Sequence, residues 1–133
     1  KAMATTTATF TLNTPDFTGG GSFRVSTQLY KADSTTGLDQ FTGIARVYKA
    51  AATTDISLVA AADYSGTAGK LYVKNTSDTA ASTYVLMEVG SNEPIGRLFP
   101  GDWMFIPCDG TENIKATTSD AGMSFEWGFF HQG

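Results

Sequence analysis

Hydrophobic and polar residues alternate one by one in three segments in the second half of this chain. In residues 70–75 (KLYVKN), Leu71 and Val73 alternate with Tyr72 and Lys74. Residues 84–89 (YVLMEV) and 123–130 (MSFEWGFF) follow the same pattern. Their apolar side chains on one face are Val85, Met87, Val89, Met123, Phe125, Trp127 and Phe129. A period of two is that of a half-buried β-strand, so these segments predict three strands and much of the core.

Shorter apolar segments separated by turn residues fill the rest of the chain. The further predicted strands are residues 22–30, 41–49, 55–60, 95–99, 103–107 and 114–117, and residues 61–69 are compatible with one helical turn. No segment shows a convincing helical period. About eight strands with turns between them predict a single all-β domain, an antiparallel β-sandwich.

The first 21 residues have a different character. Residues 4–12 (ATTTATFTL) favour β structure but bring little apolar surface, and Pro15 and the three glycines 19–21 follow them. Glycine-rich joints are flexible. We therefore expect a flexible N-terminal arm at residues 1–21 and a sandwich domain at residues 22–133.

A polar turn interrupts the most apolar stretch, residues 98–107 (LFPGDWMFIP). Pro100 fits the first central position of a β-turn, and Gly101 tolerates a positive φ at the second. The flanking residues predict two neighbouring buried strands, joined by an exposed hairpin at Pro100, Gly101 and Asp102. This turn is predicted to be structural and not a site.

Charge and composition restrict the partners. The net charge is −4 and charged residues make up 17% of the chain, with no run of one sign. Nucleic acid is excluded as a partner, because its binding depends on Lys and Arg that neutralise phosphates. No apolar run approaches the roughly 18 residues of a membrane-spanning helix, so no membrane association is expected.

Candidate chemical groups are few. Cys108 and His131 are the only cysteine and histidine, and a nucleophilic dyad would need them to meet in space. Acidic residues in turns, Asp102, Asp109 and Asp120 among them, could converge on calcium, although turns favour Asp in any case. The sequence predicts no catalytic residue, no cofactor and no metal site. Asn75 begins a three-residue glycosylation sequon, a pattern that also arises by chance.

Outward-facing aromatic residues are the remaining signal. If the inward faces are as assigned above, several large side chains point the other way: Tyr30, Tyr48, Tyr72, Tyr84, Leu86 and Phe130. Aromatic residues are enriched where proteins meet. Tyr30, Tyr72, Tyr84 and Phe130 therefore form a predicted protein interface. The alternative is that both faces of one sheet are covered within the fold.

Residues 69–130, about half the chain, resemble a pattern in small virion structural proteins of tailed bacteriophages. The pattern is a strand like LYVKN (71–75), a Ser/Thr-rich loop, a strand ending in Val-Gly (89–90) and a Leu-x-Pro-Gly-acidic turn (98–102). It continues with an aromatic strand ending near a proline (103–107), a short strand (114–117), an acidic-Gly turn and a closing aromatic strand (123–130).

This resemblance implies a sandwich that is often jelly-roll-like, and a non-enzymatic role in the virion. Capsid decoration or stabilisation, head fibres and tail appendages are the possible places, and such proteins are commonly homotrimers. It further implies partners among the major capsid protein or neighbouring virion proteins, with assembly in the cytoplasm of the bacterial host. The alternative function is a carbohydrate-binding or host-receptor-binding β-sandwich module, in which Trp or Tyr side chains stack on sugar rings.

Overall fold

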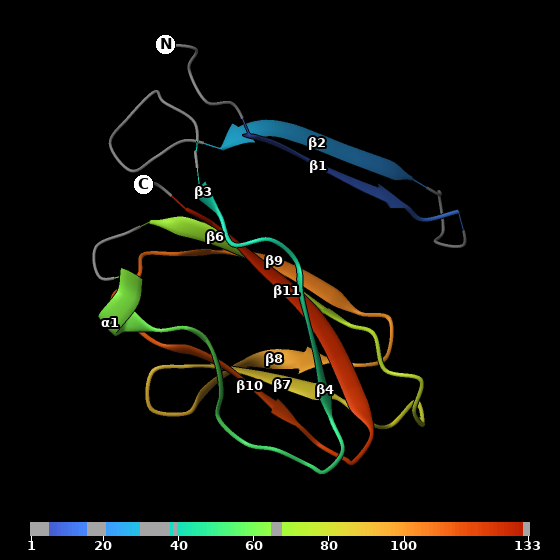
Figure 1. Ribbon diagram of the computed structural model, residues 1–133. Coiled ribbons are helices and arrows are strands. Elements are labelled where there is room, and N and C mark those ends of the chain that lie inside the picture. Colours follow the sequence, from blue (N-terminus) through green and yellow to red (C-terminus); the bar gives the residue numbers. More distant parts are fainter. Residues whose placement is uncertain (1–5, 16–20, 30–37, 39, 65–67, 132–133) are drawn as a thin grey trace.

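The computed structural model describes residues 6–15, 21–29, 38, 40–64 and 68–131. These residues form two packed antiparallel sheets and a separate hairpin (Figure 1). The strands are β1 (Thr6–Asn13), β2 (Ser22–Leu29), β3 (Gln40–Phe41), β4 (Ala45–Lys49), β5 (Ile56–Val59), β6 (Gly69–Asn75), β7 (Val85–Val89), β8 (Glu93–Leu98), β9 (Trp103–Cys108), β10 (Ile114–Thr118) and β11 (Met123–His131), and α1 (Ala61–Tyr64) is a single helical turn. The predicted β-sandwich is confirmed.

The strand pairing follows one long hairpin. Strands β4 to β7 pair in reverse order with β8 to β11: β7 with β8, β6 with β9, β5 with β10 and β4 with β11. Two further pairings, β6 with β11 and β7 with β10, join these ribbons into two sheets. The β7 sheet has the order β5-β10-β7-β8, and the β6 sheet has the order β3-β11-β6-β9, with β4 also paired to β11.

The core lies between the two sheets. Leu71 and Val73 of β6, Met87 of β7, and Phe125 and Phe129 of β11 are fully buried. The alternating pattern assigned these side chains to the inner face, and the structure confirms it. Alternation was informative here because each of these strands has a neighbouring strand on both sides and the opposite sheet against one face.

The segment predicted as one strand over residues 41–49 forms two short ones. Both β3 and β4 pair with β11, and Gly43 between them has a φ of +82°. The side chains of Phe41 and Ile44 cross over Gly128 of β11. A Cβ at Gly128 would lie 2.7 Å from the Phe41 ring and 3.0 Å from Ile44. Because Gly128 has no side chain, the segment that contains Phe41 and Ile44 can lie directly against β11.

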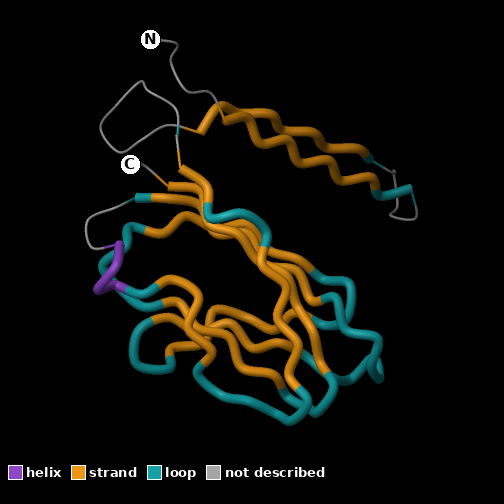
Figure 2. The backbone as a smooth tube through the Cα atoms, in the orientation of Figure 1, coloured by secondary structure: helices purple, strands orange, loops and turns teal. Residues whose placement is uncertain are grey.

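The N-terminal hairpin differs from the expected arm. Residues 6–13 form β1, and β1 pairs along its whole length with β2, the segment that the sequence placed in the sandwich. Among the described strands, β1 and β2 pair with each other alone. Figure 2 shows this hairpin running alongside the sandwich and apart from both sheets. The alternation in residues 22–29 is present, but the face that it creates does not enter the core.

The turn at Pro100 and Gly101 connects the two sheets. The expected hairpin between neighbouring strands is wrong, because β8 pairs with β7 in one sheet and β9 pairs with β6 in the other. The flanking strands are also less buried than predicted: in β8 only Leu98 is buried, and in β9 Trp103 is 51% exposed. The local turn geometry is as predicted: the Asp102 N–H donates to the Phe99 carbonyl at 2.8 Å, and Gly101 has a φ of +92°. Proline followed by a positive-φ glycine is a type II turn.

Asn75 of β6 fixes this turn from inside the fold. Its fully buried side chain donates from Nδ2 to the Leu98 carbonyl at 2.7 Å and accepts from the Ser77 N–H at 2.9 Å. Its backbone N–H donates to the Asp102 carbonyl, and its carbonyl accepts from the Gly101 N–H, both at 2.9 Å. Asn75 thus forms hydrogen bonds to residues on both sides of the turn that joins β8 to β9.

Candidate functional site

The outer face of the β6 sheet carries a group of aromatic side chains, which we call the aromatic face. Successive strand residues point to opposite faces, so the neighbours of core residues point outward. The aromatic face consists of Phe41, Tyr72, Trp103, Phe105 and Phe130. The rings of Phe41 and Phe130 stack at 4.2 Å, and Phe105 meets Phe130 edge-on at 6.4 Å. Trp103 remains 51% exposed and Phe41 47% exposed.

Tyr72 lies on this face with its hydroxyl satisfied. The hydroxyl donates to Glu126 Oε1 at 2.8 Å, and Glu126 Oε2 lies 3.7 Å from Nε of Arg46. Burial, together with the hydrogen bond to Glu126, raises the pKa of Tyr72 to about 12. Its ring is therefore neutral at physiological pH, and its polar end already has a partner.

The hairpin has one apolar face and one polar face. Phe10 lies opposite Val25, and Leu12 lies opposite Phe23, so the four side chains share a face. We call these four residues the apolar hairpin face. The other face carries Thr, Ser, Asn, Gln and Arg side chains. The four apolar side chains are 38% to 54% exposed.

A groove separates the two apolar surfaces. It has a volume of about 710 Å³, and its large side chains are Phe10 and Val25 on the hairpin and Tyr72, Trp103, Phe105 and Phe130 on the sheet. The hairpin contacts the aromatic face through Phe10 and Trp103, whose ring centroids are 5.8 Å apart. Protein interiors leave few voids larger than a water molecule. A groove of this size is therefore open space outside the packed core, and its apolar lining makes it a candidate binding surface.

The four predicted interface residues do not form one patch. Tyr72 and Phe130 both lie on the aromatic face. Tyr84 lies beside the β7 sheet, where it packs edge-on against Phe99 at 6.0 Å and under the Arg97 guanidinium at 4.3 Å. Tyr30 falls outside the described residues.

Cys108 and His131 occupy the strands on either side of Gly69. Gly69 of β6 pairs with Cys108 on β9 and with His131 on β11. Adjacent strands are about 4.8 Å apart, which places the two backbones about 10 Å apart. The His131 ring stacks on Phe129, with centroids 5.3 Å apart. Burial raises the pKa of the Cys108 thiol to about 11. An activated cysteine has a lowered pKa, so this pair lacks the electrostatics of a nucleophilic dyad.

The acidic turn residues are bonded within their own turns. Asp109 accepts from both the N–H and the hydroxyl of Thr111, which lowers the pKa of Asp109. Asp102 accepts from the Phe99 N–H at 3.0 Å, and Asp120 accepts from the serine before it. Within the described ranges, no three His, Cys, Asp or Glu residues are placed to hold a metal ion.

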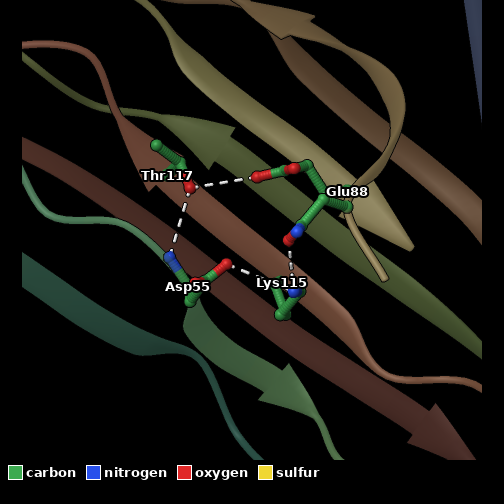
Figure 3. A network of polar contacts seen from close by, with 5 residues as sticks. Asp55, Glu88, Lys115 and Thr117 are labelled. Carbon is green, nitrogen blue, oxygen red and sulfur yellow. Dashed lines mark hydrogen bonds and ion pairs between the residues drawn. The ribbon is translucent and has the colours of Figure 1, made fainter. Parts of the chain in front are cut away.

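A polar network on the β7 sheet holds two strained residues in place (Figure 3). Asp55 and Asn92 are the non-glycine residues with positive φ in the described part of the chain, at +55° and +81°. Lys115 Nζ lies 3.2 Å from Asp55 Oδ1 and donates to Asn92 Oδ1 at 2.7 Å. Thr117 accepts from the Asp55 N–H at 3.2 Å and donates to Glu88 Oε1 at 3.1 Å. These bonds connect β7 and β10 to the residue before β5 and to the turn between β7 and β8, so the network has a structural role.

Sequence reasoning did not assign Phe10, Phe41, Trp103 or Phe105 to the site. A signal was present for two of them, because Trp103 and Phe105 alternate with Met104 and Ile106 and cannot share their face. Only the pairing of β9 with β6 decides which of the two sets points outward. For Phe10 and Phe41, the short flanking patterns carried no comparable signal.

Comparisons with known proteins do not extend this description. No family model matches the chain, no curated protein matches it, and no solved structure matches it. In the part of the chain that the structure describes, no helix is long and apolar enough to cross a membrane.

Proposed function

We propose that this chain is a non-enzymatic structural protein of a bacteriophage virion that acts through protein–protein assembly, as a capsid decoration or stabilising protein or as an appendage. One observation carries the proposal: a single small domain exposes two apolar surfaces, the aromatic face and the apolar hairpin face. Large exposed apolar patches on soluble proteins mark interaction sites. Aromatic side chains with few charges among them are typical of the centre of such sites.

The strand plan supports the same reading. Eight strands that pair as one long hairpin and roll into two sheets have the plan of a jelly roll, and we assign the domain to this class. Jelly rolls occur in viral capsid domains and in lectins. The resemblance of residues 69–130 to small virion proteins favours the first of these.

The partners in this proposal are other proteins of the particle. The protein forms a homotrimer and binds the major capsid protein or a neighbouring virion protein in the virion, which assembles in the cytoplasm of the bacterial host. In the β6 sheet, β9 is an edge strand among the described strands, and an apolar edge is a further surface for assembly. The net charge of −4 favours protein partners over nucleic acid.

Trp103 favours a second candidate function. A tryptophan that is 51% exposed on a sheet face offers a ring on which a sugar can stack. The second candidate is therefore a carbohydrate-binding or host-receptor-binding module.

The test is quantitative mass spectrometry of purified particles from the phage that encodes the chain. We expect the chain at a fixed copy number per particle that is a multiple of three. Absence from particles, together with saturable binding of the purified protein to one glycan, would replace the first function by the second. Loss of that glycan binding in Trp103→Ser protein would locate the sugar on the aromatic face.

A further inference from the structure

The exposure of the hairpin increases from its base to its tip. At the base, Leu29 is 7% exposed and its carbonyl accepts from the N–H of Leu38, which is 3% exposed. Further along, Phe10 and Val25 are 38% and 42% exposed, and the last apolar pair, Leu12 and Phe23, is 47% and 54% exposed. The base is therefore anchored, and the described part of the chain does not cover the tip of the apolar hairpin face.

A hairpin of this kind needs a surface to pack on. A two-stranded sheet by itself is marginally stable in water. Here the paired strands are eight residues long and contact the sandwich mainly through Phe10 and Trp103 and through the bond from Thr6 Oγ1 to the Leu38 carbonyl at 3.0 Å. The groove beneath the hairpin remains open, so the chain does not close its two apolar surfaces on each other.

We propose that the tip of the hairpin of one copy packs in the groove of a second copy of this chain. Each copy then contributes one apolar hairpin face and one groove, and the exchange covers both. Leu12 and Phe23 of the first copy lie against Trp103, Phe105 and the neighbouring aromatic side chains of the next. The polar face of the hairpin, with Thr11 and Arg24 opposite each other, stays in water.

The size of the surfaces favours a second copy as the occupant. A hairpin of eight residue pairs is roughly 27 Å long and about 10 Å wide. Docking of the exposed parts of Phe10, Leu12, Phe23 and Val25 buries roughly 250 Å² on the hairpin and a similar area on the groove, so two reciprocal contacts bury roughly 1,000 Å². That area is the lower bound of specific protein interfaces. In a closed ring of three copies, each hairpin would pack in the groove of the next copy, which gives three such contacts.

Three variants test the exchange in solution, with association measured by sedimentation velocity at micromolar concentration. The hairpin variant carries Leu12→Ser and Phe23→Ser, and the groove variant carries Phe41→Ser and Trp103→Ser. The control variant carries Thr11→Ser and Arg24→Ser, the rung between the two apolar pairs but on the polar face. All four apolar side chains to be changed are 47% or more exposed, so the fold is expected to persist, which circular dichroism checks.

We expect the wild type and the control variant to form oligomers, and the hairpin and groove variants each to lose at least tenfold in association constant. A mixture of the hairpin and groove variants should associate more strongly than either variant alone but more weakly than the wild type, because one intact hairpin meets one intact groove between unlike copies and the second contact is lost. If the groove variant does not fold, Trp103→Ser alone replaces it.

A monomeric wild type overturns the exchange. So does a hairpin variant that assembles like the wild type, or a mixture that associates no more strongly than either variant alone although each variant folds. The virion role does not enter this argument. A chain found in particles but monomeric in solution would overturn the exchange and the homotrimer and leave the virion role standing. Hairpin exchange by a protein absent from particles would overturn the virion role alone.

Discussion

Gly101 is a residue whose backbone alone restricts substitution. Its φ is +92°, and a Cβ built on it would have no atom within 4 Å. An alanine there meets no steric neighbour but must adopt a left-handed conformation, which costs roughly 1–2 kcal/mol. We expect Gly101→Ala to lower the free energy of unfolding by that amount, measured by urea denaturation.

Gly96 in β8 is the matched control for this prediction. It also has open space around its Cβ position, but its φ is not in the positive region. At such a position alanine is neutral or stabilises by up to about 1 kcal/mol. Equal effects of Gly101→Ala and Gly96→Ala would show that the turn does not require the left-handed conformation.

Asn75 is expected to be among the most sensitive polar residues. Asn75→Ala leaves the Leu98 carbonyl and the Ser77 N–H without their side-chain partner inside the fold. An unsatisfied buried group costs about 1–3 kcal/mol, so we expect a loss of about 2–4 kcal/mol in chemical denaturation. Asn113→Ala, which removes one exposed bond to the Ala61 N–H, should cost about 1 kcal/mol or less. Similar losses in both variants would contradict the central role of Asn75 in the inter-sheet turn.

The Cys108 thiol should be unreactive. Burial raises its pKa from 9.0 to about 11, and the thiolate is the reactive form. At pH 8 the thiolate fraction is then about 100-fold lower than for an unperturbed thiol, and alkylation by iodoacetamide should be slower by at least that factor. The same protein unfolded in urea is the control and should react at the rate of a free cysteine. Rapid alkylation of the folded protein would reopen the question of a nucleophile beside His131.

At the scale of elements, the hairpin and the sandwich should be separable. The core cluster contains no residue of β1 or β2, and in the described structure these strands pair only with each other. Removal of residues 1–29 should therefore leave a cooperatively unfolding sandwich whose free energy of unfolding, measured on monomeric protein, falls by about 1–3 kcal/mol, the contribution of the Phe10–Trp103 pair and the Thr6–Leu38 hydrogen bond. Phe129→Ala in the full chain is the contrast, since truncation of a buried Phe costs about 3–5 kcal/mol.

A truncation that keeps the sandwich folded must remove both β1 and β2. Removal of the predicted arm alone, residues 1–21, would take away β1 and leave β2 without its partner. We expect that shorter product to aggregate, because an unpaired strand with apolar side chains is exposed. An unfolded product after removal of residues 1–29 would contradict the separation and make the hairpin part of the folding unit.

For the whole molecule, two raised pKa values predict a loss of stability at alkaline pH. Tyr72 and Cys108 are neutral when protonated, and the folded state holds both protons more tightly than the unfolded state. Their contribution is complete below pH 9 and is lost as the pH rises through about 11 for Cys108 and about 12 for Tyr72. Melting temperatures from pH 8 to 12 should fall accordingly. Cys108→Ala should flatten the first part of that fall, and Tyr72→Phe the last part. An unchanged profile in both variants would place the alkaline transition elsewhere.

The sequence by itself determined the all-β class, the inner faces of the central strands and the local turn. Alternation in residues 70–75 and 123–130 identified Leu71 and Phe125 as core residues, because a pleated strand must point its apolar side chains to one side. Pro100 and Gly101 predicted a β-turn with Gly101 at positive φ, because proline is preset for the first central position and glycine accepts a positive φ at the second, and the structure has this type II turn. Both are local properties that depend on a residue and its near neighbours.

Only the tertiary structure decided which strands are neighbours and which apolar faces are left uncovered. Phe23 and Val25 alternate as clearly as Leu71 and Val73 do, yet the first pair is exposed and the second is buried. The difference lies in pairing across long stretches of chain, since β6 is paired on both sides while β2 meets β1 alone. The same long-range pairing separated β8 from β9 and buried Asn75 between them. An alternating pattern shows that the two faces of a strand differ in polarity. Residues far away in the sequence decide what covers each face.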